Sequence, residues 1–335
     1  MSVTHGTSRH TVRSTPRRRA SVARVTLALV VVATIGSWTT GPAGAHRWSA
    51  PPLVCGELPT TDVVLRSDLT CETPFHFVGP GPSVSIDLGG HTLTVPGDAG
   101  RCTAPGPCGA IAGAAAVRNG GVIGTLSDIG DIRGVIVIGD VEVGLGFAGT
   151  PGPASVRRTM VLNGSVRIWG PDATVADSLV GGAVVIASTN RAVRNLVIER
   201  NWIVRSPGDG VSIAPLPGSF PDDVTGRIRH NVILWSAGHG IAIGSGLWNV
   251  GALAIEGNAL VGNGGDGFRS GTDATGPPTA LGGPVTLTGN LALLNHGHGF
   301  DAGWMTGVAG TGIVDGGGNL AFANGMDPPC SGIDC

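Results

Sequence analysis

Four segments in the second half of the chain follow one template, and this repeat limits the folds that are open to the protein. Aligned on Asn201, Asn231, Asn258 and Asn290, the segments are separated by 30, 27 and 32 residues. Each has an apolar residue three positions before the asparagine and a further one, sometimes small, two positions after it. Glycines follow at positions seven and nine. Apolar residues that alternate with a period of two indicate β-strands, so the repeat predicts a solenoid with one coil per copy.

The composition also favours short strands and turns. Glycine provides 58 of the 335 residues, and only 4% are aromatic. Each glycine inside a helix costs about 1 kcal/mol relative to alanine, which makes helical repeats a poor fit. The leucine frame of leucine-rich repeats is absent. We therefore predict an all-β fold, a single-domain parallel β-helix of about ten coils.

This fold assigns roles to the repeated positions. Inward residues such as Ile198, Ile203, Val211 and Ile213 should form apolar columns, because successive coils stack ~4.8 Å apart. The asparagines should stack inside the coils as a ladder whose amides hydrogen-bond along the axis, so that no buried polar group lacks a partner. The ladder would consist of Asn201, Asn231, Asn258, Asn290 and Asn319.

The first 45 residues have the pattern of an export signal. They carry six arginines and no acidic residue, followed by an apolar run over 25–36 and an Ala-Gly-Ala sequence ending at Ala45. This predicts a cleaved signal peptide over 1–45, because the apolar run is shorter than the ~20 residues that span a bilayer. Cleavage would remove six of the 21 positive charges and leave 15 − 23 = −8. We therefore expect no nucleic-acid partner and no membrane association after cleavage.

The six cysteines fall into three couples that are close in sequence. An exported chain meets an oxidising compartment, where such couples form disulfides. We expect the nearest neighbours to pair as structural staples near the two ends, and we expect no metal site because the CxxC spacing is absent. The couples are Cys55 with Cys71, Cys102 with Cys108, and Cys330 with Cys335.

The order of motifs also resembles a known group of proteins. "SIDLGGHTLT" (85–94), "VRNGGVIG" (117–124), the asparagine-centred coils and "DGGGNLAFANGMDPPCSGIDC" (315–335) are similar to the secreted right-handed parallel β-helix proteins of the pectate-lyase-like superfamily. The resemblance implies one right-handed β-helix domain over 46–335, with a cap region over 46–110 and a C-terminal cap over 315–335. It implies no single activity, because the superfamily includes lyases, hydrolases, epimerases, metal-delivery proteins and members without known activity.

One polar position recurs between the paired glycines of each copy. It is Asp209, His239, Asp266 and His298 in turn, with Asp327 in a fading fifth copy. One interpretation is a turn, in which the glycines supply the positive φ and the Asp or His side chain bonds to local backbone. The other is a site with Asp209, His239 and Asp266 as catalytic candidates. Two carboxylates two coils apart would have Cα atoms ~9.6 Å apart, near the upper end of the ~6.5–9.5 Å separation in inverting glycosidases.

The segments "GHGIAIGSG" (238–246) and "GDGVSI" (208–213) look like parts of polygalacturonases. Two departures stand against that function. The paired-aspartate coil of that family is missing between these segments, because Asp222 and Asp223 fall in a loop, and the chain contains no lysine.

Long loops follow the third strand of each coil and should emerge along one edge. Phe220, Trp248 and Trp304 lie on them, and aromatic rings beside polar groups are typical of sugar-binding grooves. With His298, Asp301 and Arg269, these three aromatic residues are the candidate substrate-binding residues.

Together these features predict a secreted, monomeric protein that engages extracellular or cell-wall polysaccharide. The alternatives are a polygalacturonase-like hydrolase or pectate-lyase-like lyase, and a structural or adhesive surface protein. We expect no cofactor, although a lyase would need calcium. Copper held by His239, His296 and His298 lacks a spacing signature.

Overall fold

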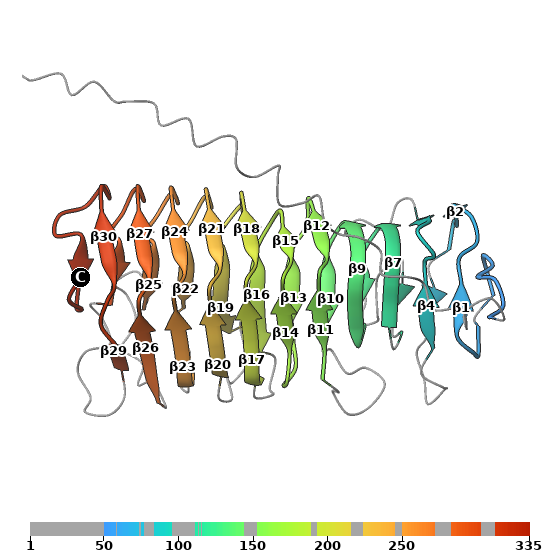
Figure 1. Cartoon of the computed structure of the whole chain (residues 1–335), viewed down its shortest axis with the longest axis horizontal. Helices are drawn as coiled ribbons and strands as arrows, with labels where there is room; N and C mark the ends of the chain where they lie inside the picture. The colour runs from blue at the N-terminus through green and yellow to red at the C-terminus, as the bar shows by residue number, and fades with distance from the viewer. Residues whose placement is uncertain are drawn as a thin grey trace, which may run out of the picture. The chain divides into compact units, whose positions relative to one another are not determined.

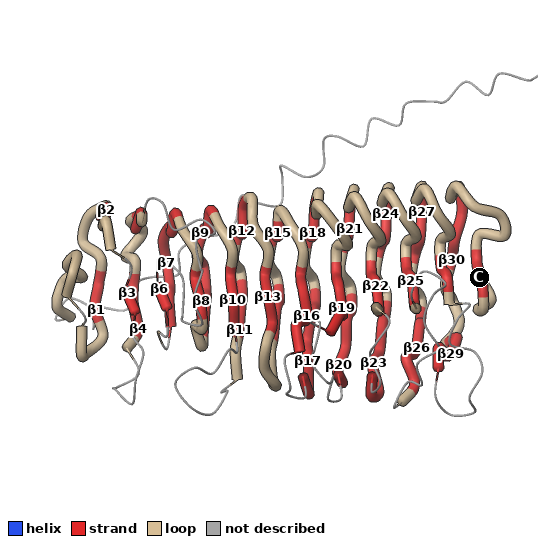
Figure 2. The backbone as a smooth tube through the Cα atoms, turned by 180° about the vertical axis from the view of Figure 1, so that it is seen from behind, coloured by secondary structure: helices blue, strands red, loops and turns tan. Residues whose placement is uncertain are grey.

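The structure, a computed structural model, describes residues 50–57, 59–73, 75–76, 84–95, 111–112, 114, 116–143, 153–188, 193–215, 224–244, 250–271, 283–302 and 312–335. All of them belong to the compact unit Ala45–Cys335. Within these ranges every regular element is a β-strand, and no helix is present that could cross a membrane. The strands stack in coils along one axis (Figures 1 and 2).

Each full coil contributes one strand to each of three columns, and every pairing between coils is parallel. The first column contains β1 (Val63–Val64), β4 (Ser85–Asp87), β7 (Ala116–Ile123), β9 (Asp131–Ile138), β11 (Ser155–Arg157), β14 (Thr174–Ala176), β17 (Val193–Glu199), β20 (Val224–Arg229), β23 (Val250–Glu256), β26 (Pro284–Thr288) and β29 (Gly312–Asp315).

The second column joins the first through the long strands β7 and β9, which makes one 20-stranded sheet. Its own strands are β2 (Leu69–Thr70), β5 (Thr92–Thr94), β12 (Met160–Leu162), β15 (Leu179–Val180), β18 (Trp202–Val204), β21 (Val232–Leu234), β24 (Ala259–Val261), β27 (Leu291–Leu293) and β30 (Leu320–Phe322).

The third column is a separate 11-stranded parallel sheet. It consists of β3 (Phe75–His76), β6 (Ile111–Ala112), β8 (Leu126–Ser127), β10 (Val141–Val143), β13 (Val166–Ile168), β16 (Val184–Ser188), β19 (Val211–Pro215), β22 (Ile241–Ile243), β25 (Phe268–Ser270), β28 (Phe300–Asp301) and β31 (Cys330–Ser331). The all-β architecture and its long parallel sheets are consistent with a β-helix.

The apolar columns predicted inside the coils are confirmed. Ile198, Ile203, Val211 and Ile213 are fully buried, and their neighbours in adjacent coils are apolar and buried as well. Ile198, for example, is in register with Ile228, which is in register with Ile255. The core is therefore a stack of equivalent apolar layers.

The inward asparagine ladder is also confirmed. The side-chain Nδ2 of Asn201 donates to Oδ1 of Asn231 at 3.0 Å, and the same bond links Asn231 to Asn258, Asn258 to Asn290 and Asn290 to Asn319. Each oxygen also accepts the backbone N–H of the preceding asparagine. Because all five are buried, the ladder satisfies polar groups that water cannot reach.

A second ladder lies at the next corner of the coil. Asn263 donates from Nδ2 to Oδ1 of Asn295 at 2.9 Å, and Asn295 donates to Asn324 at 3.0 Å. The preceding copies have serine at this position, and the N–H of Ser236 donates to Oδ1 of Asn263. Two corners of each late coil are therefore held by amide stacks.

Disulfides close both ends of the described chain. Cys55 is bonded to Cys71 and Cys330 to Cys335, as the nearest-neighbour prediction requires. Cys102 and Cys108 lie outside the described residues. The two bonds fit an oxidising environment.

From β9 onward, the outward side of the second column differs from that of the other two, because its strand residues are apolar in one coil after another. Its strands follow one another from β12 to β30 along one edge in Figure 1. One outward row runs in register through Ile136, Met160, Leu179, Trp202, Val232, Ala259, Leu291 and Leu320, and a parallel row includes Ile138, Leu162, Val204, Leu234, Val261, Leu293 and Phe322. We call these two rows the apolar face.

Candidate functional site

The repeated Asp/His position forms a column on the outside of the coils. The N–H of Gly210 donates to the carbonyl of His239, that of Gly240 to the carbonyl of Asp266, and that of Gly267 to the carbonyl of His298, at 2.9, 3.0 and 3.0 Å. The four residues Asp209, His239, Asp266 and His298 therefore occupy equivalent positions in consecutive coils. We call them the Asp/His column.

Each side chain of this column reaches forward to the backbone of the next coil. A carboxylate oxygen of Asp209 accepts the N–H of His239 at 2.8 Å. Nδ1 of His239 accepts the N–H of Asp266 at 2.9 Å, and Oδ1 of Asp266 accepts the N–H of His298 at 2.6 Å. Aspartate and histidine alternate without breaking the pattern, because both offer an acceptor atom at the same reach.

The hydrogen bonds at Nδ1 determine whether the other ring nitrogen, Nε2, is a donor or an acceptor in each neutral histidine of the column. Nδ1 of His239 accepts a backbone N–H, so the neutral ring carries its proton on Nε2. Nδ1 of His298 lies 2.8 Å from the carbonyl oxygen of Pro328, which can only accept, so His298 carries its proton on Nδ1. The two rings therefore offer opposite chemistry at Nε2, a donor on His239 and an acceptor on His298.

The expectation that Asp327 continues the column is wrong. Phe300 is in register with Cys330, which aligns His298 with Pro328. Asp327 lies one residue earlier and is exposed. The last coil breaks the glycine frame before its cysteine, so the sequence alignment slips by one position there.

The proposed reason for the paired glycines is also wrong. None of the glycines that flank the four column residues has a positive φ. Their smallness is needed for a steric reason instead. A Cβ on Gly265 would lie 2.5 Å from Nδ1 of His239, and one on Gly240 would lie 2.5 Å from the carbonyl oxygen of Gly267. In the pairs Gly238/Gly240 and Gly265/Gly267, the first glycine leaves room for a column side chain and the second leaves room for the backbone of the next coil.

Asp266 is the centre of the polar groups in the column. Its side chain is 7% exposed, and its Oδ2 lies 3.2 Å from Nδ1 of His239 and 3.7 Å from Nη1 of Arg269. Burial acts to raise the pKa of Asp266, but the contact with His239 in its protonated form, the hydrogen bond from the N–H of His298 and the charge of Arg269 lower it overall. Asp266 is therefore an ionised carboxylate at neutral pH.

Arg269 and Asp301 extend this cluster onto the third column. They are in register on β25 and β28 and point outward, between buried neighbours on each strand. The Arg269–Asp266 contact was not predicted from the sequence. The sequence feature that could have indicated this contact is the three-residue spacing of Asp266 and Arg269, across the turn that leads into β25.

The remaining predicted site residues are not brought to this cluster by the described structure. Asp209 lies two coils away from Asp266, as predicted. The two are linked by hydrogen bonds through His239, whose N–H donates to Asp209 and whose Nδ1 accepts the N–H of Asp266. Phe220, Trp248 and Trp304 lie outside the described residues. Across the described part of the chain, no three His, Cys, Asp or Glu side chains form a group that could hold a metal ion.

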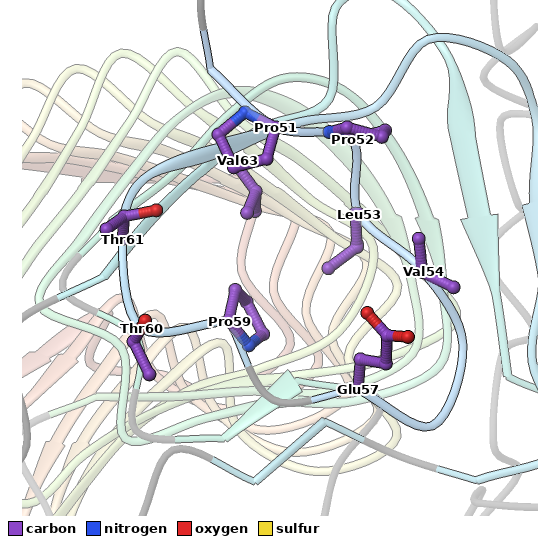
Figure 3. Close-up of a pocket in the computed structure, with 9 residues that line it drawn as sticks. All are labelled: Pro51, Pro52, Leu53, Val54, Glu57, Pro59, Thr60, Thr61 and Val63. Carbon is purple, nitrogen blue, oxygen red and sulfur yellow. The ribbon is translucent and has the colours of Figure 1, made fainter.

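A pocket lies at the N-terminal end of the coils and contains no member of the column. Figure 3 shows Pro51, Pro52, Leu53, Val54, Glu57, Pro59, Thr60, Thr61 and Val63 around it. Glu57 is its one ionisable side chain. Its mostly apolar lining therefore fits the end of the coils better than it fits a catalytic site.

Comparison with known proteins identifies no relative. No family model matches the chain, and no curated protein or solved structure matches it significantly.

Proposed function

We propose that this protein is an exported right-handed parallel β-helix, related to the pectate-lyase-like superfamily, that binds extracellular or cell-wall polysaccharide. The binding surface would be the outward side of β19, β22, β25 and β28, next to the Asp/His column. The observation that carries the proposal is the cluster of Asp266, His239 and Arg269, with Asp301 in register with Arg269. Ionised groups and imidazole nitrogens fixed on a rigid sheet suit the recognition of sugar hydroxyls and uronate carboxylates.

Binding is better supported than hydrolysis by the state of the carboxylates. A glycosidase of the inverting type needs one carboxyl group whose pKa is raised, so that it can donate a proton. The pKa of Asp266 is lowered instead. Asp266 also accepts the backbone N–H of His298 from the next coil, which favours its ionised form. A lyase would need calcium and a basic arginine, for which Arg205 and Arg269 are the candidates from the sequence.

The test is binding of the purified exported protein to a panel of uronate and neutral polysaccharides, with and without calcium, with turnover followed in parallel. We expect Arg269→Gln to weaken binding of an anionic polysaccharide about tenfold, equivalent to about 1.4 kcal/mol. Arg227→Gln is the matched control, because Arg227 is exposed on β20 of the other sheet.

Two results would contradict the proposal. Folded protein that binds none of the polysaccharides would favour a structural or adhesive role. Equal loss of affinity in the Arg269 and Arg227 variants would mean that the charge of the whole protein, rather than this surface, attracts the polymer. Turnover by the wild type that Asp266→Asn abolishes would instead establish an enzyme.

A further inference from the structure

The apolar face is an extended feature of the described surface that the proposed function does not use. Its strand positions are apolar from Ile136 on β9 to Phe322 on β30, and all of these positions are described. Several of the side chains are exposed, among them Trp202, Leu320 and Phe322 at 39%, 57% and 51%. Single apolar side chains on a surface are ordinary, but a run of this length, broken only by Gly181 in the second row, marks an interaction site.

The corner that follows the second column widens this face toward the C-terminus. Trp235 and Leu294 occupy equivalent corner positions two coils apart and are 56% and 55% exposed. The indole of Trp235 lies against the intervening corner residue, Gly262, where a Cβ would be 2.8 Å from its Cδ1. The indole therefore fills the space above Gly262, and the apolar surface continues from one coil to the next.

The size of the face is sufficient for association between proteins. Eight strands from β9 to β30, spaced ~4.8 Å apart, give a length of ~38 Å. Three strand residues and one corner residue at ~3.3 Å each give a width of ~13 Å. The resulting ~500 Å² on each of two partners buries ~1,000 Å², which reaches the lower limit for a specific interface.

We propose that this face binds a second copy of the chain, which would form a two-fold dimer in place of the monomer expected from the sequence. A flat face whose strands repeat at one spacing is complementary to itself, because rows of side chains from one copy can pack between rows of the other. The strand positions carry no charge that two copies would have to bury together, and among the corner positions counted in the width only Arg205, at the margin of the face, is charged.

The charges of the chain favour a second copy over a lipid surface. Peripheral membrane faces combine apolar residues with basic residues that contact anionic lipids. The formal net charge here is −2, and six of the arginines lie within the first 45 residues. Arg200, at the corner before β18, is held by Asp177 and Glu199 at 2.7 and 2.8 Å. Its charge is therefore already neutralised within the protein.

The test compares the wild type with the double variant Trp235→Arg, Leu294→Asn by sedimentation equilibrium over micromolar concentrations. The new residues suit this corner, because Arg205 and Asn163 already occupy its equivalent in other coils with the same positive φ. We expect a dimeric wild type and a Kd for the double variant that is more than tenfold higher. Val314→Thr is the control, because Val314 is a half-exposed apolar residue on β29 and its neighbour in register is Thr286.

Three outcomes would overturn the proposal. The wild type could remain monomeric at all concentrations, or its dimer could be unaffected by the double variant, which would locate the interface elsewhere. The wild type could also bind vesicles of neutral phospholipid as a monomer, which would assign the face to lipid. If circular dichroism shows that the double variant is unfolded, Leu320→Thr in the exposed last coil tests the same face with a single change.

Discussion

The asparagine ladder and the Asp/His column are two stacks built by the same repeat, one inside the coils and one outside. Both pass hydrogen bonds from each coil to the next over 27 to 32 residues. Inside, the residue is asparagine in all five copies, because each amide must donate to one partner and accept from another without water. Outside, aspartate and histidine alternate, because Asp209, His239 and Asp266 each need only one acceptor atom for the N–H of the next coil, and no amide donor is required of them. Burial therefore decides how strictly a repeat restricts residue type.

The strongest test of this difference is Asn258→Leu in the buried ladder. The change removes Oδ1 of Asn258, which accepts hydrogen bonds from the backbone N–H and the side-chain Nδ2 of Asn231. It also removes Nδ2 of Asn258, which donates to the carbonyl of Ile228. Because buried polar groups then lose their partners, we expect the free energy of unfolding to fall by about 3 kcal/mol or more. Urea unfolding measures it. Asn195→Gly is the control, an exposed asparagine with φ 55° that should change stability by no more than ~0.5 kcal/mol.

A smaller effect is expected for Asp266→Asn in the outer column. Asparagine keeps an acceptor for the His298 N–H but loses the charge that faces Arg269. The pKa of Asp266 is lowered in the folded protein, so its contribution is present above the unfolded pKa of ~3.9 and is lost as the pH falls through the folded pKa. We expect a loss of about 1–2 kcal/mol at pH 7.

Urea unfolding can compare the free energies of unfolding of the wild type and the Asp266→Asn variant across the acidic pH range. The difference in stability should shrink below about pH 4, where Asp266 becomes protonated first in the unfolded chain and, at lower pH, in the folded wild type. A difference that stays constant down to pH 2 would mean that the charge of Asp266 does not contribute, and that the outer column acts through its shape alone.

The smallest effect is expected for His239→Asn. The amide oxygen of asparagine can take the place of Nδ1 as the acceptor of the Asp266 N–H. We therefore expect stability to change by no more than about 0.5 kcal/mol, measured by thermal unfolding. A loss close to that of Asn258→Leu would contradict the distinction between the two stacks. Loss of polysaccharide binding at unchanged stability would instead place the imidazole at the ligand.

Much of the fold could be predicted from the sequence, because in the later coils the contacts between neighbours recur every 27 to 32 residues. The identical asparagines and the alternating apolar residues record those contacts directly, as Asn231 and Ile233 illustrate. The cysteine pairs that the structure describes are close in sequence, so local proximity was enough to predict them.

The details of the Asp/His column were harder to predict from the sequence. The paired glycines suggest positive φ, but the atoms that exclude a side chain at Gly240 and Gly265 belong to neighbouring coils. The positive φ values fall instead on corner residues such as Arg205, Trp235 and Leu294, which no composition rule selects. Hydrogen-bond direction in the column likewise depends on coordinates, because Asp and His can each accept in more than one way.

The sequence by itself determined that this chain forms short parallel strands in stacked coils with an amide ladder inside, because a local period of two and a long repeat leave few other folds. Only the tertiary structure decided which apolar side chains are core and which are surface. Val232, Ile233 and Leu234 are all apolar, yet Ile233 alone is buried. Because the strand closes the coil, the side chains of Val232 and Leu234 point outward. There they form part of the apolar face.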